Sequence, residues 1–347
     1  MVKVSFIVPI YNVEEYVAEC IESMCNQKEE QVEIILVDDG SSDHSLEICN
    51  SYAKKDNRIK VIHQENQGAN IARNKGLKEA AGEWVCFVDG DDYVEPDICT
   101  GLAEYMEQPY DIICYSYNKA ANGKIRKVNS NAEKIIFEKD DFKKMQIATL
   151  NRLGNYPYNA SVLDTVSIWN KMYRRAFLQK NQLEFIPKMP KLQDLTFNLK
   201  VYDYAQSGIY VNLPLYNYRI NQASVSHRYQ KNIVEKFEII NQYLIDFVAQ
   251  KEETIYKTAL EERLATHLRT CIVLYFCNGE NKESYKKRKK EFLSLREREP
   301  YATAMKQVDF KNFTWKETIL SWAIKHKMFW VCEMLYKLEI GIRNKGC

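Results

Sequence analysis

Short apolar runs alternate with amphipathic segments along the first part of the chain. The predicted strands cover residues 4–10, 32–37, 58–62 and 84–88. The predicted helices between them cover residues 13–28, 41–52 and 68–81, where apolar side chains recur at helical spacing. This alternation predicts an α/β fold whose doubly wound, mostly parallel sheet carries helices on both faces. In such folds ligands bind outside the carboxyl ends of the strands.

The pattern is less regular between residues 110 and 227. Further strands are predicted at residues 111–117, 135–137, 209–211 and 215–219, further helices at 140–150 and 195–204, and a loop at 151–162. From residue 230 almost to the end, apolar residues recur at helical spacing. We therefore expect a helical C-terminal region.

The composition is that of a compact globular protein, with 347 residues, 46% hydrophobic residues and 12 glycines. Its ten cysteines form no C-x-x-C pair, which favours the reduced thiols of a cytoplasmic protein. The apolar start of the chain ends at Pro9 and is too short for a signal peptide. No apolar run approaches the ~20 residues of a membrane-spanning helix, so we expect a cytoplasmic location.

Acidic residues gather at the ends of two predicted strands. Asp89-Gly90-Asp91-Asp92 follows one strand, and Asp38-Asp39 follows another and precedes a helix. Crowded carboxylates repel one another and stay ionised at neutral pH when a cation joins them, and their oxygens suit Mg²⁺ or Mn²⁺. The ordinary alternatives are an Asp/Gly turn and a helix cap, but a cap does not explain both Asp38 and Asp39.

Four motifs stand in a fixed order along this part of the chain. They are Pro9-Ile10-Tyr11-Asn12, then Val37-Asp38-Asp39-Gly40-Ser41-Ser42-Asp43, then Asn66-Gln67-Gly68 with Ala72-Arg73-Asn74-Lys75-Gly76, then Phe87-Val88-Asp89-Gly90-Asp91-Asp92-Tyr93. In that order the chain resembles the family-two glycosyltransferases of the GT-A fold, strongly over residues 1–115 and more loosely to His227. The resemblance implies a Rossmann-like GT-A domain at 1–229, with a nucleotide-binding half at 1–115, an acceptor-binding half at 116–229, and a helical region at 230–347.

Carried over position by position, the resemblance implies a nucleotide site and a metal site. The implied nucleotide-binding residues are Pro9, Tyr11, Asp38, Asp39, Arg73 and Asp89. Pro9 and Tyr11 would line the base pocket, and Asp39 would receive the uracil N–H. Asp89 and Asp91 would be the ends of the D-x-D motif, with Asp91 the more direct ligand of Mn²⁺ or Mg²⁺. His227 would complete the metal shell or the diphosphate contacts, although a lone histidine is more often structural.

The catalytic base of similar enzymes comes from a Glu-Asp pair at the start of a helix. This chain has Gln193-Asp194 there, so the resemblance implies that Asp194 removes the proton of the acceptor hydroxyl. Gln193 departs from the usual Glu, which puts the role of that first acid in doubt. The alternative reading of Asp194 is an aspartate that only interacts with the helix dipole.

Four more residues are expected to contact donor or acceptor, namely Asp92, Trp169, Lys171 and Arg219. Asp92 would bond the backbone or the transferred sugar. Trp169 would stack under a sugar ring, while Lys171 and Arg219 would meet phosphates. Alternatively, Trp169 belongs to the core and the adjacent arginines form a solvated helix face.

The basic excess lies in the C-terminal third. Residues 230–347 hold 22 Lys/Arg against 16 Asp/Glu, whereas residues 1–229 hold 27 against 31. The basic run 286–290 lies beside no nucleic-acid motif, so we expect no nucleic-acid partner. Segment 314–338 combines helical apolar spacing with tryptophans and lysines, so the region 282–338 fits a peripheral contact with the inner face of the plasma membrane. Packing against the catalytic domain, or a homodimer contact, would give the same pattern.

The resemblance, together with the two acidic clusters, implies an inverting, metal-dependent hexosyltransferase that acts in capsular polysaccharide or exopolysaccharide biosynthesis. It would move a hexose or N-acetylhexosamine from a UDP-sugar to a hydroxyl of a growing, lipid-linked cell-surface glycan. One alternative is a non-catalytic nucleotide- or glycan-binding partner subunit, which Gln193 leaves open. Another is a sugar-1-phosphate nucleotidyltransferase, but Tyr11-Asn12-Val13-Glu14-Glu15 stands where its Gly-rich loop belongs.

Overall fold

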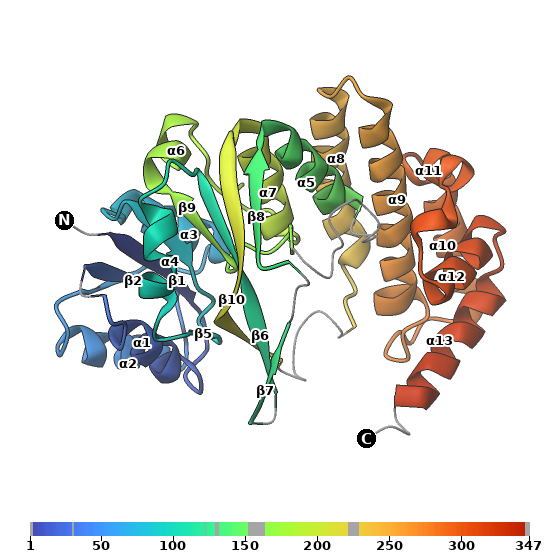
Figure 1. Cartoon of the computed structure of the whole chain (residues 1–347). Helices are drawn as coiled ribbons and strands as arrows, with labels where there is room; N and C mark the ends of the chain where they lie inside the picture. Colours follow the sequence, from blue (N-terminus) through green and yellow to red (C-terminus); the bar gives the residue numbers. More distant parts are fainter. Residues whose placement is uncertain are drawn as a thin grey trace. The chain divides into compact units, whose positions relative to one another are not determined.

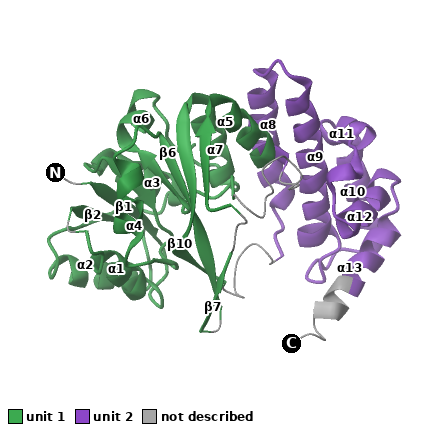
Figure 2. Ribbon diagram, viewed as in Figure 1, with its two compact units in different colours: residues 1–149, 157–222 green, residues 150–156, 223–347 purple. Residues whose placement is uncertain are grey.

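The structure is a computed structural model that describes residues 3–29, 31–121, 123–128, 132–151, 164–220 and 229–343. The chain divides into two compact units, residues 1–149 with 157–222 (unit 1) and residues 150–156 with 223–347 (unit 2; Figure 2). The predicted domain limits at 115/116 and 229/230 stay predictions. Residues 152–162 of the predicted loop lie outside the described residues.

Unit 1 is built around one mixed sheet of ten strands in the described residues (Figure 1). The strands are β1 (Val4–Ile10), β2 (Val32–Asp38), β3 (Ile59–His63), β4 (Trp84–Phe87), β5 (Tyr93–Val94), β6 (Ile112–Ala121), β7 (Lys124–Lys127), β8 (Lys134–Glu138), β9 (Lys171–Arg174) and β10 (Ser207–Arg219). They lie in the order β3-β2-β1-β4-β9-β6-β10-β5, with β7 on β6 and β8 on β10.

The first four strands form the parallel part of the sheet. β1 pairs in parallel with both β2 and β4, and β2 pairs in parallel with β3. β9 then runs antiparallel between β4 and β6, after which β6 and β10 pair in parallel. The parallel order of β1, β2 and β4 brings their carboxyl ends to one edge, where both acidic clusters lie.

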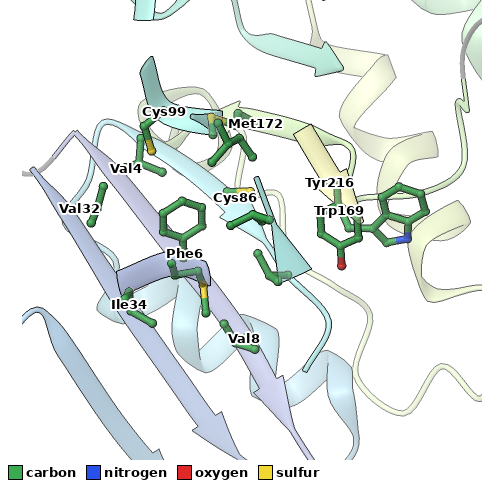
Figure 3. Packing of buried hydrophobic residues seen from close by; sticks show 14 of the residues in the cluster. Val4, Phe6, Val8, Val32, Ile34, Cys86, Cys99, Trp169, Met172 and Tyr216 are labelled. Atoms are coloured by element: carbon green, nitrogen blue, oxygen red, sulfur yellow. The ribbon is translucent and has the colours of Figure 1, made fainter. Parts of the chain in front are cut away.

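Helices cover both faces of the sheet, as predicted. They are α1 (Val17–Cys25), α2 (Ser45–Ala53), α3 (Ala69–Glu79), α4 (Ile98–Met106), α5 (Lys139–Asn151), α6 (Arg175–Lys180) and α7 (Gln193–Tyr204). The buried apolar residues of α1, α2 and α4 share one core with one face of the sheet, which Figure 3 shows in part. Those of α3, α5, α6 and α7 share a second core with the other face. The predicted α/β fold is therefore confirmed.

The two short strands predicted at 209–211 and 215–219 are one strand in the structure. β10 runs from Ser207 to Arg219 beside β6, and its register shifts on both sides of Pro214. Proline lacks the N–H that a ladder position needs, so the pairing slips there without ending the strand. As a result, one long strand carries Tyr216 and Arg219 to the acidic edge.

Unit 2 is helical in its described residues. Its helices are α8 (Ile233–Ala249), α9 (Thr254–Cys271), α10 (Tyr285–Glu297), α11 (Tyr301–Gln307), α12 (Trp315–Lys325) and α13 (Phe329–Arg343). Within the described parts of the chain, we find no helix with the length and apolar character that crossing a bilayer requires.

Candidate active site

The acidic turn Asp89–Asp92 leaves the carboxyl end of β4 (Trp84–Phe87). Its backbone closes through a hydrogen bond from the Asp92 N–H to the Asp89 carbonyl, 3.0 Å long. A Cβ atom on Gly90 would lie 3.2 Å from the Pro9 carbonyl oxygen, so the turn can press against the end of β1 because position 90 is glycine. The three carboxylates thus lie beside the end of β1, which carries Pro9 and leads into Tyr11.

Asp92 is the structural member of this turn. Its buried carboxylate accepts a hydrogen bond from the Tyr216 hydroxyl (2.8 Å) and another from the Arg219 N–H (2.7 Å). Burial raises the pKa of Asp92 to about 8, and the charges of Asp89 and Asp91 act in the same direction. Asp92 was expected to bond either the backbone or the transferred sugar, and the structure shows a bond to the backbone N–H of Arg219.

Arg73 connects the acidic turn to the predicted base. From the buried face of α3, its guanidinium lies 2.7 Å from Asp89 Oδ1 and 3.8 Å from Asp194 Oδ1. Its side chain also stacks over the Phe185 ring, with the guanidinium carbon 5.4 Å from the ring centre. The guanidinium therefore joins the turn after β4 to α7, which follows about a hundred residues later in the chain.

Asp194 lies in the first turn of α7 with its side chain 24% exposed. One oxygen accepts a long hydrogen bond from the Ile168 N–H (3.4 Å). Burial raises the pKa of Asp194 to about 6, although the Arg73 guanidinium acts in the opposite direction. A carboxylate with this pKa is ionised at neutral pH and is a stronger base than an ordinary aspartate.

Gln193 stands beside Asp194 as the first residue of α7. Its side-chain amide donates a hydrogen bond to the Met189 carbonyl, 3.3 Å away. Leu192 before it takes a left-handed backbone conformation, with φ 55°. This conformation turns the chain sharply into the helix and places Gln193 and Asp194 together at its start.

Asp91 and Asp89 form a pair of carboxylates that could share a cation. Burial raises the pKa of Asp91, and the neighbouring charge of Asp89 raises it further. Among the residues described, no three His, Cys, Asp or Glu side chains are arranged to hold a metal ion. Two carboxylates nevertheless match the protein ligands with which Mg²⁺ usually binds beside substrate phosphates, so the donor set fits such an ion. His227, the third predicted ligand, lies outside the described residues.

The second acidic cluster follows β2 and is deeply buried. Asp39 accepts hydrogen bonds from the Gln64 amide and from the N–H groups of Gln67 and Gly68, each 2.8 Å long. Because a carboxylate accepts about four hydrogen bonds, Asp39 keeps roughly one acceptor position for a ligand. The Asp38 carboxylate bonds the His63 ring (2.7 Å).

The end of β1 faces the same edge. Tyr11 is exposed, and Asn12, with φ 51°, hydrogen-bonds the segment after β2. Its side-chain oxygen accepts from the Ser42 N–H (2.8 Å), and its own N–H donates to the Ser41 hydroxyl (3.2 Å). These bonds hold the Tyr11 segment next to Asp39.

Arg219 lies at the acidic turn and is already bonded. Its Nε donates to the Asp91 carbonyl (2.8 Å), and its terminal nitrogen pairs with Glu19 (2.7 Å). The guanidinium also stacks over the rings of Tyr16 and Tyr93. The structure therefore places Arg219 beside the predicted metal ligand, where it fixes the backbone of the turn.

Two predicted contact residues do not face this site. Trp169 is buried beside Tyr216 (Figure 3). Its ring stacks on those of Tyr216 and Tyr218, with ring centres 4.7 and 5.5 Å away. Lys171 is fully buried, and its ammonium donates to the carbonyls of Asp164 (2.7 Å) and Ser167 (2.5 Å). The core alternative thus describes Trp169, and the phosphate contact expected of Lys171 does not fit its burial.

The same alternative predicts that the arginines after Lys171, Arg174 and Arg175, form a solvated helix face. The structure corrects this for Arg174, which ends strand β9, whereas Arg175 is the first residue of helix α6. Arg174 donates to the Tyr110 carbonyl (2.8 Å), and Arg175 to the Gly82 carbonyl (2.6 Å). Both arginines therefore bind segments that border the sheet.

Sequence reasoning assigned no role to Tyr216, Glu19 or His63. The Tyr216 hydroxyl accepts a hydrogen bond from the Asp89 N–H (3.1 Å) and donates to Asp92, so it holds both ends of the acidic turn. The only signal for Tyr216 was its place within the span up to His227, over which the chain resembles the family loosely. None existed for Glu19 or His63, because their partners depend on which helix and strand lie side by side.

Comparisons with known proteins agree on one family. Residues 5–179 match the model for glycosyl transferase family 2. The glycosyltransferase EpsH of Bacillus subtilis is 33% identical over 273 residues, which cover 78% of this chain and 76% of that protein.

Solved structures share the fold at lower identity. TarS residues 1–349 from Staphylococcus aureus, in complex with UDP-GlcNAc, superpose with a TM-score of 0.66 at 21% identity, covering 96% of this chain and 90% of that one. The mannosyltransferase PcManGT from Pyrobaculum calidifontis, in complex with GDP-Man and Mn²⁺, gives 0.51 at 14% identity, covering 99% and 86%. At these identities the likeness concerns the fold alone.

Proposed function

Because the chain belongs to glycosyl transferase family 2 and has the GT-A fold, we propose that it inverts the anomeric centre of a nucleotide sugar during transfer. The proposed donor is a UDP-hexose or UDP-N-acetylhexosamine, and the proposed acceptor is a hydroxyl of a growing, lipid-linked cell-surface glycan. The UDP-GlcNAc bound by TarS supports the choice of donor. The similarity to the glycosyltransferase EpsH supports the transfer of a glycosyl group, but it does not favour any one acceptor.

The observation that carries the proposal is the position of Arg73 between Asp89 and Asp194. A transferase needs a group that binds the leaving diphosphate and a base that meets the acceptor on the opposite side of the sugar. Asp89 belongs to the acidic turn and Asp194 to α7 (Gln193–Tyr204), and one buried guanidinium holds both. We assign the turn to the diphosphate and Asp194 to the acceptor.

In the proposed step, Asp194 takes the proton of the acceptor hydroxyl as its oxygen attacks the anomeric carbon. The new carbon–oxygen bond forms while the bond from that carbon to the diphosphate breaks, so UDP leaves with the electron pair. Asp39 would accept the uracil N–H at its remaining acceptor position, and Pro9 and Tyr11 would line the base. Gln193, an uncharged amide, would hydrogen-bond a hydroxyl of donor or acceptor.

Asp89 and Asp91 would hold Mn²⁺ or Mg²⁺ next to the diphosphate, with His227 as a proposed third ligand. A divalent cation there supplies electrostatic stabilisation of the negative charge that develops on UDP. The residues of the chain prepare this position, because Tyr216 and Arg219 fix the turn from β10. We assign Asp92 to the structure of the turn, because its buried carboxylate accepts hydrogen bonds from the Tyr216 hydroxyl and the Arg219 N–H.

The non-catalytic alternative rests on Gln193, which removes one carboxylate from the usual pair. It predicts a protein that binds UDP or glycan and does not release UDP from a donor. The structure keeps Asp194 beside Arg73 with a raised pKa, an arrangement that a binding subunit does not need. We therefore favour the enzyme.

The decisive experiment measures UDP release from a panel of UDP-sugars with candidate acceptors, in Mn²⁺, in Mg²⁺ and in EDTA. We expect release from one donor class, dependent on the cation and on the acceptor. Absence of release with every donor, combined with retained UDP binding, would support the binding subunit. Release of diphosphate from UTP and a sugar phosphate would instead identify a nucleotidyltransferase.

A further inference from the structure

Two helices of unit 2 each expose a stripe of apolar side chains. The stripe on α12 (Trp315–Lys325) consists of Trp315, Ile319 and Trp322, and the stripe on α13 (Phe329–Arg343) consists of Trp330, Met334 and Leu338. Residues three or four positions apart lie on the same side of a helix, so each triple forms a continuous stripe. The helices pack against each other, and we call the six residues together the tryptophan face.

The tryptophan face is exposed, whereas the opposite sides of both helices are buried in the core of unit 2. Ser321, Ile324 and Cys332 are buried in unit 2. Phe329 is buried too, and its ring lies 5.5 Å from that of Phe292 on α10. The helices are therefore firmly attached, while Trp315 is 70% exposed and Trp330 57%. Exposed apolar clusters of this kind mark interaction sites.

The two acidic side chains described on α12 and α13 pair with arginines beneath them. Glu317 of α12 pairs with Arg269 (2.8 Å), and Glu333 of α13 pairs with Arg288 (2.6 Å). Both arginines come from helices beneath, and both are largely buried, so these carboxylates are neutralised on the inner side. Lysines are exposed on the same two helices, among them Lys316 and Lys337, although the Lys337 ammonium also lies 3.8 Å from Glu333.

We propose that the tryptophan face docks this protein on the surface of an anionic phospholipid bilayer. Tryptophan favours the headgroup region because its ring is apolar and its N–H still finds partners there. The flanking lysines can bury their stems and reach anionic headgroups. A protein partner fits less well, because lysine is depleted at protein–protein interfaces and lysines flank both stripes. The inference does not depend on the proposed sugar transfer.

Vesicle flotation of the full chain tests the proposal. We expect the protein to float with vesicles of phosphatidylglycerol and phosphatidylcholine, and much less with phosphatidylcholine alone. The double variant Trp322→Gln, Trp330→Gln should lower the partition coefficient by about tenfold or more, because two apolar side chains no longer enter the interface. Ile239→Gln, which changes an exposed apolar residue of α8, is the matched control and should bind like the unmodified chain.

A charge variant separates headgroup attraction from apolar insertion. Lys316→Glu with Lys337→Glu should weaken flotation with phosphatidylglycerol vesicles, and added salt should weaken that of the unmodified chain. The proposal is overturned if neither vesicle binds, or if the tryptophan variant binds as well as the control. It is also overturned if light scattering shows a dimer that only the tryptophan variant loses, because the face would then bind a second copy. All four residues are exposed, so circular dichroism should show folded variants.

Discussion

The side chains around Asp194 decide whether it acts as a base or only as a helix-terminal aspartate. An ordinary first-turn aspartate is exposed and gains a few tenths of a kcal/mol from the helix dipole. Asp194 is instead held near a buried guanidinium, and burial raises its pKa to about 6. These are the surroundings of a group kept for chemistry, at some cost in stability.

Asp194→Asn should abolish most sugar transfer without harming the fold. Removing a general base typically lowers kcat by about 10²–10⁴-fold. The folded state should be at least as stable, because a buried carboxylate whose pKa is raised opposes folding when ionised. The control is Asp140→Asn, which removes an exposed aspartate from the first turn of α5. Retention of full transfer by Asp194→Asn would refute the assignment.

The pH dependence of kcat/KM should show an acidic limb near pH 6. Asp194 must be ionised to accept a proton, so activity is present above its pKa of about 6 and is lost as the pH falls through it. An ordinary aspartate would give a limb about two units lower. Initial rates at subsaturating donor between pH 4 and 8 measure the limb, with Mn²⁺ held saturating.

Arg73→Gln should move this limb to higher pH. The Arg73 guanidinium lowers the pKa of Asp194, so its removal lets that pKa rise. The variant should also lose activity, because Asp89 and Asp194 lose their shared partner. Lys75→Gln, on the same helix, removes a positive charge elsewhere and should leave the limb in place. An unchanged limb in Arg73→Gln would show that the two side chains are not coupled.

At the scale of single residues, the sequence identified most of the charged residues of the site. It did not predict the direction in which each side chain points. The motifs singled out Arg73, Asp89 and Asp194, and the structure brings all three together. The same motifs could not show that the Lys171 side chain points inward to carbonyl groups. A lysine two residues after a tryptophan gives the same sequence pattern whether it is buried or exposed. Side-chain direction is fixed by neighbours that arrive from elsewhere in the chain.

Elements with strong periodicity were predictable, and those fixed by long-range pairing were not. The predicted strands 4–10 and 84–88 agree with β1 and β4 to within one residue. β9 escaped prediction because Lys171–Arg174 is short and polar at both ends, and it pairs only because β4 and β6 lie on either side of it. β10 was divided in two because Pro214 interrupts its pattern.

The contact between α3 and the sheet depends on Gly76. A Cβ there would lie 2.4 Å from Ile7 Cγ2, which belongs to a β-branched side chain buried in β1 and cannot move aside. We expect Gly76→Ala to destabilise the protein by about 1–3 kcal/mol, although alanine is the better helix former. Urea unfolding measures this, with the exposed Lys78→Ala as control. A stabilised Gly76→Ala variant would show that α3 does not lie this close to β1.

At the scale of the whole molecule, the chain combines a sheet unit with a helical unit. The alternation of strands and helices predicted the first, and the helical spacing beyond residue 230 predicted the second. The same spacing did not separate the buried from the exposed side of α12 and α13. Ile324 and Phe329 belong to the core of unit 2, whereas Trp322 and Trp330 beside them are exposed.

Cation removal should weaken UDP binding if Asp91 and Asp89 hold a divalent ion. Calorimetry in Mn²⁺ should give tighter binding than in EDTA, and Asp91→Ala should behave in Mn²⁺ like the unmodified protein in EDTA. In thermal unfolding, UDP at about 100 times its Kd adds roughly 2.7 kcal/mol to stability. Equal affinities in all three conditions would remove the metal from the proposed mechanism.

The hydrogen bonds from β10 to the acidic turn set a lower limit on the length of an active fragment of this chain. The match to the family model ends at residue 179, but the Tyr216 hydroxyl and the Arg219 backbone that fix Asp89 and Asp92 come some forty residues later. A shortened chain that stops at the end of the match would keep the four motifs between Pro9 and Tyr93, but it would lose Asp194 and the two residues of β10 that fix the acidic turn. Chimeras between relatives should therefore exchange residues 1–220 as one block.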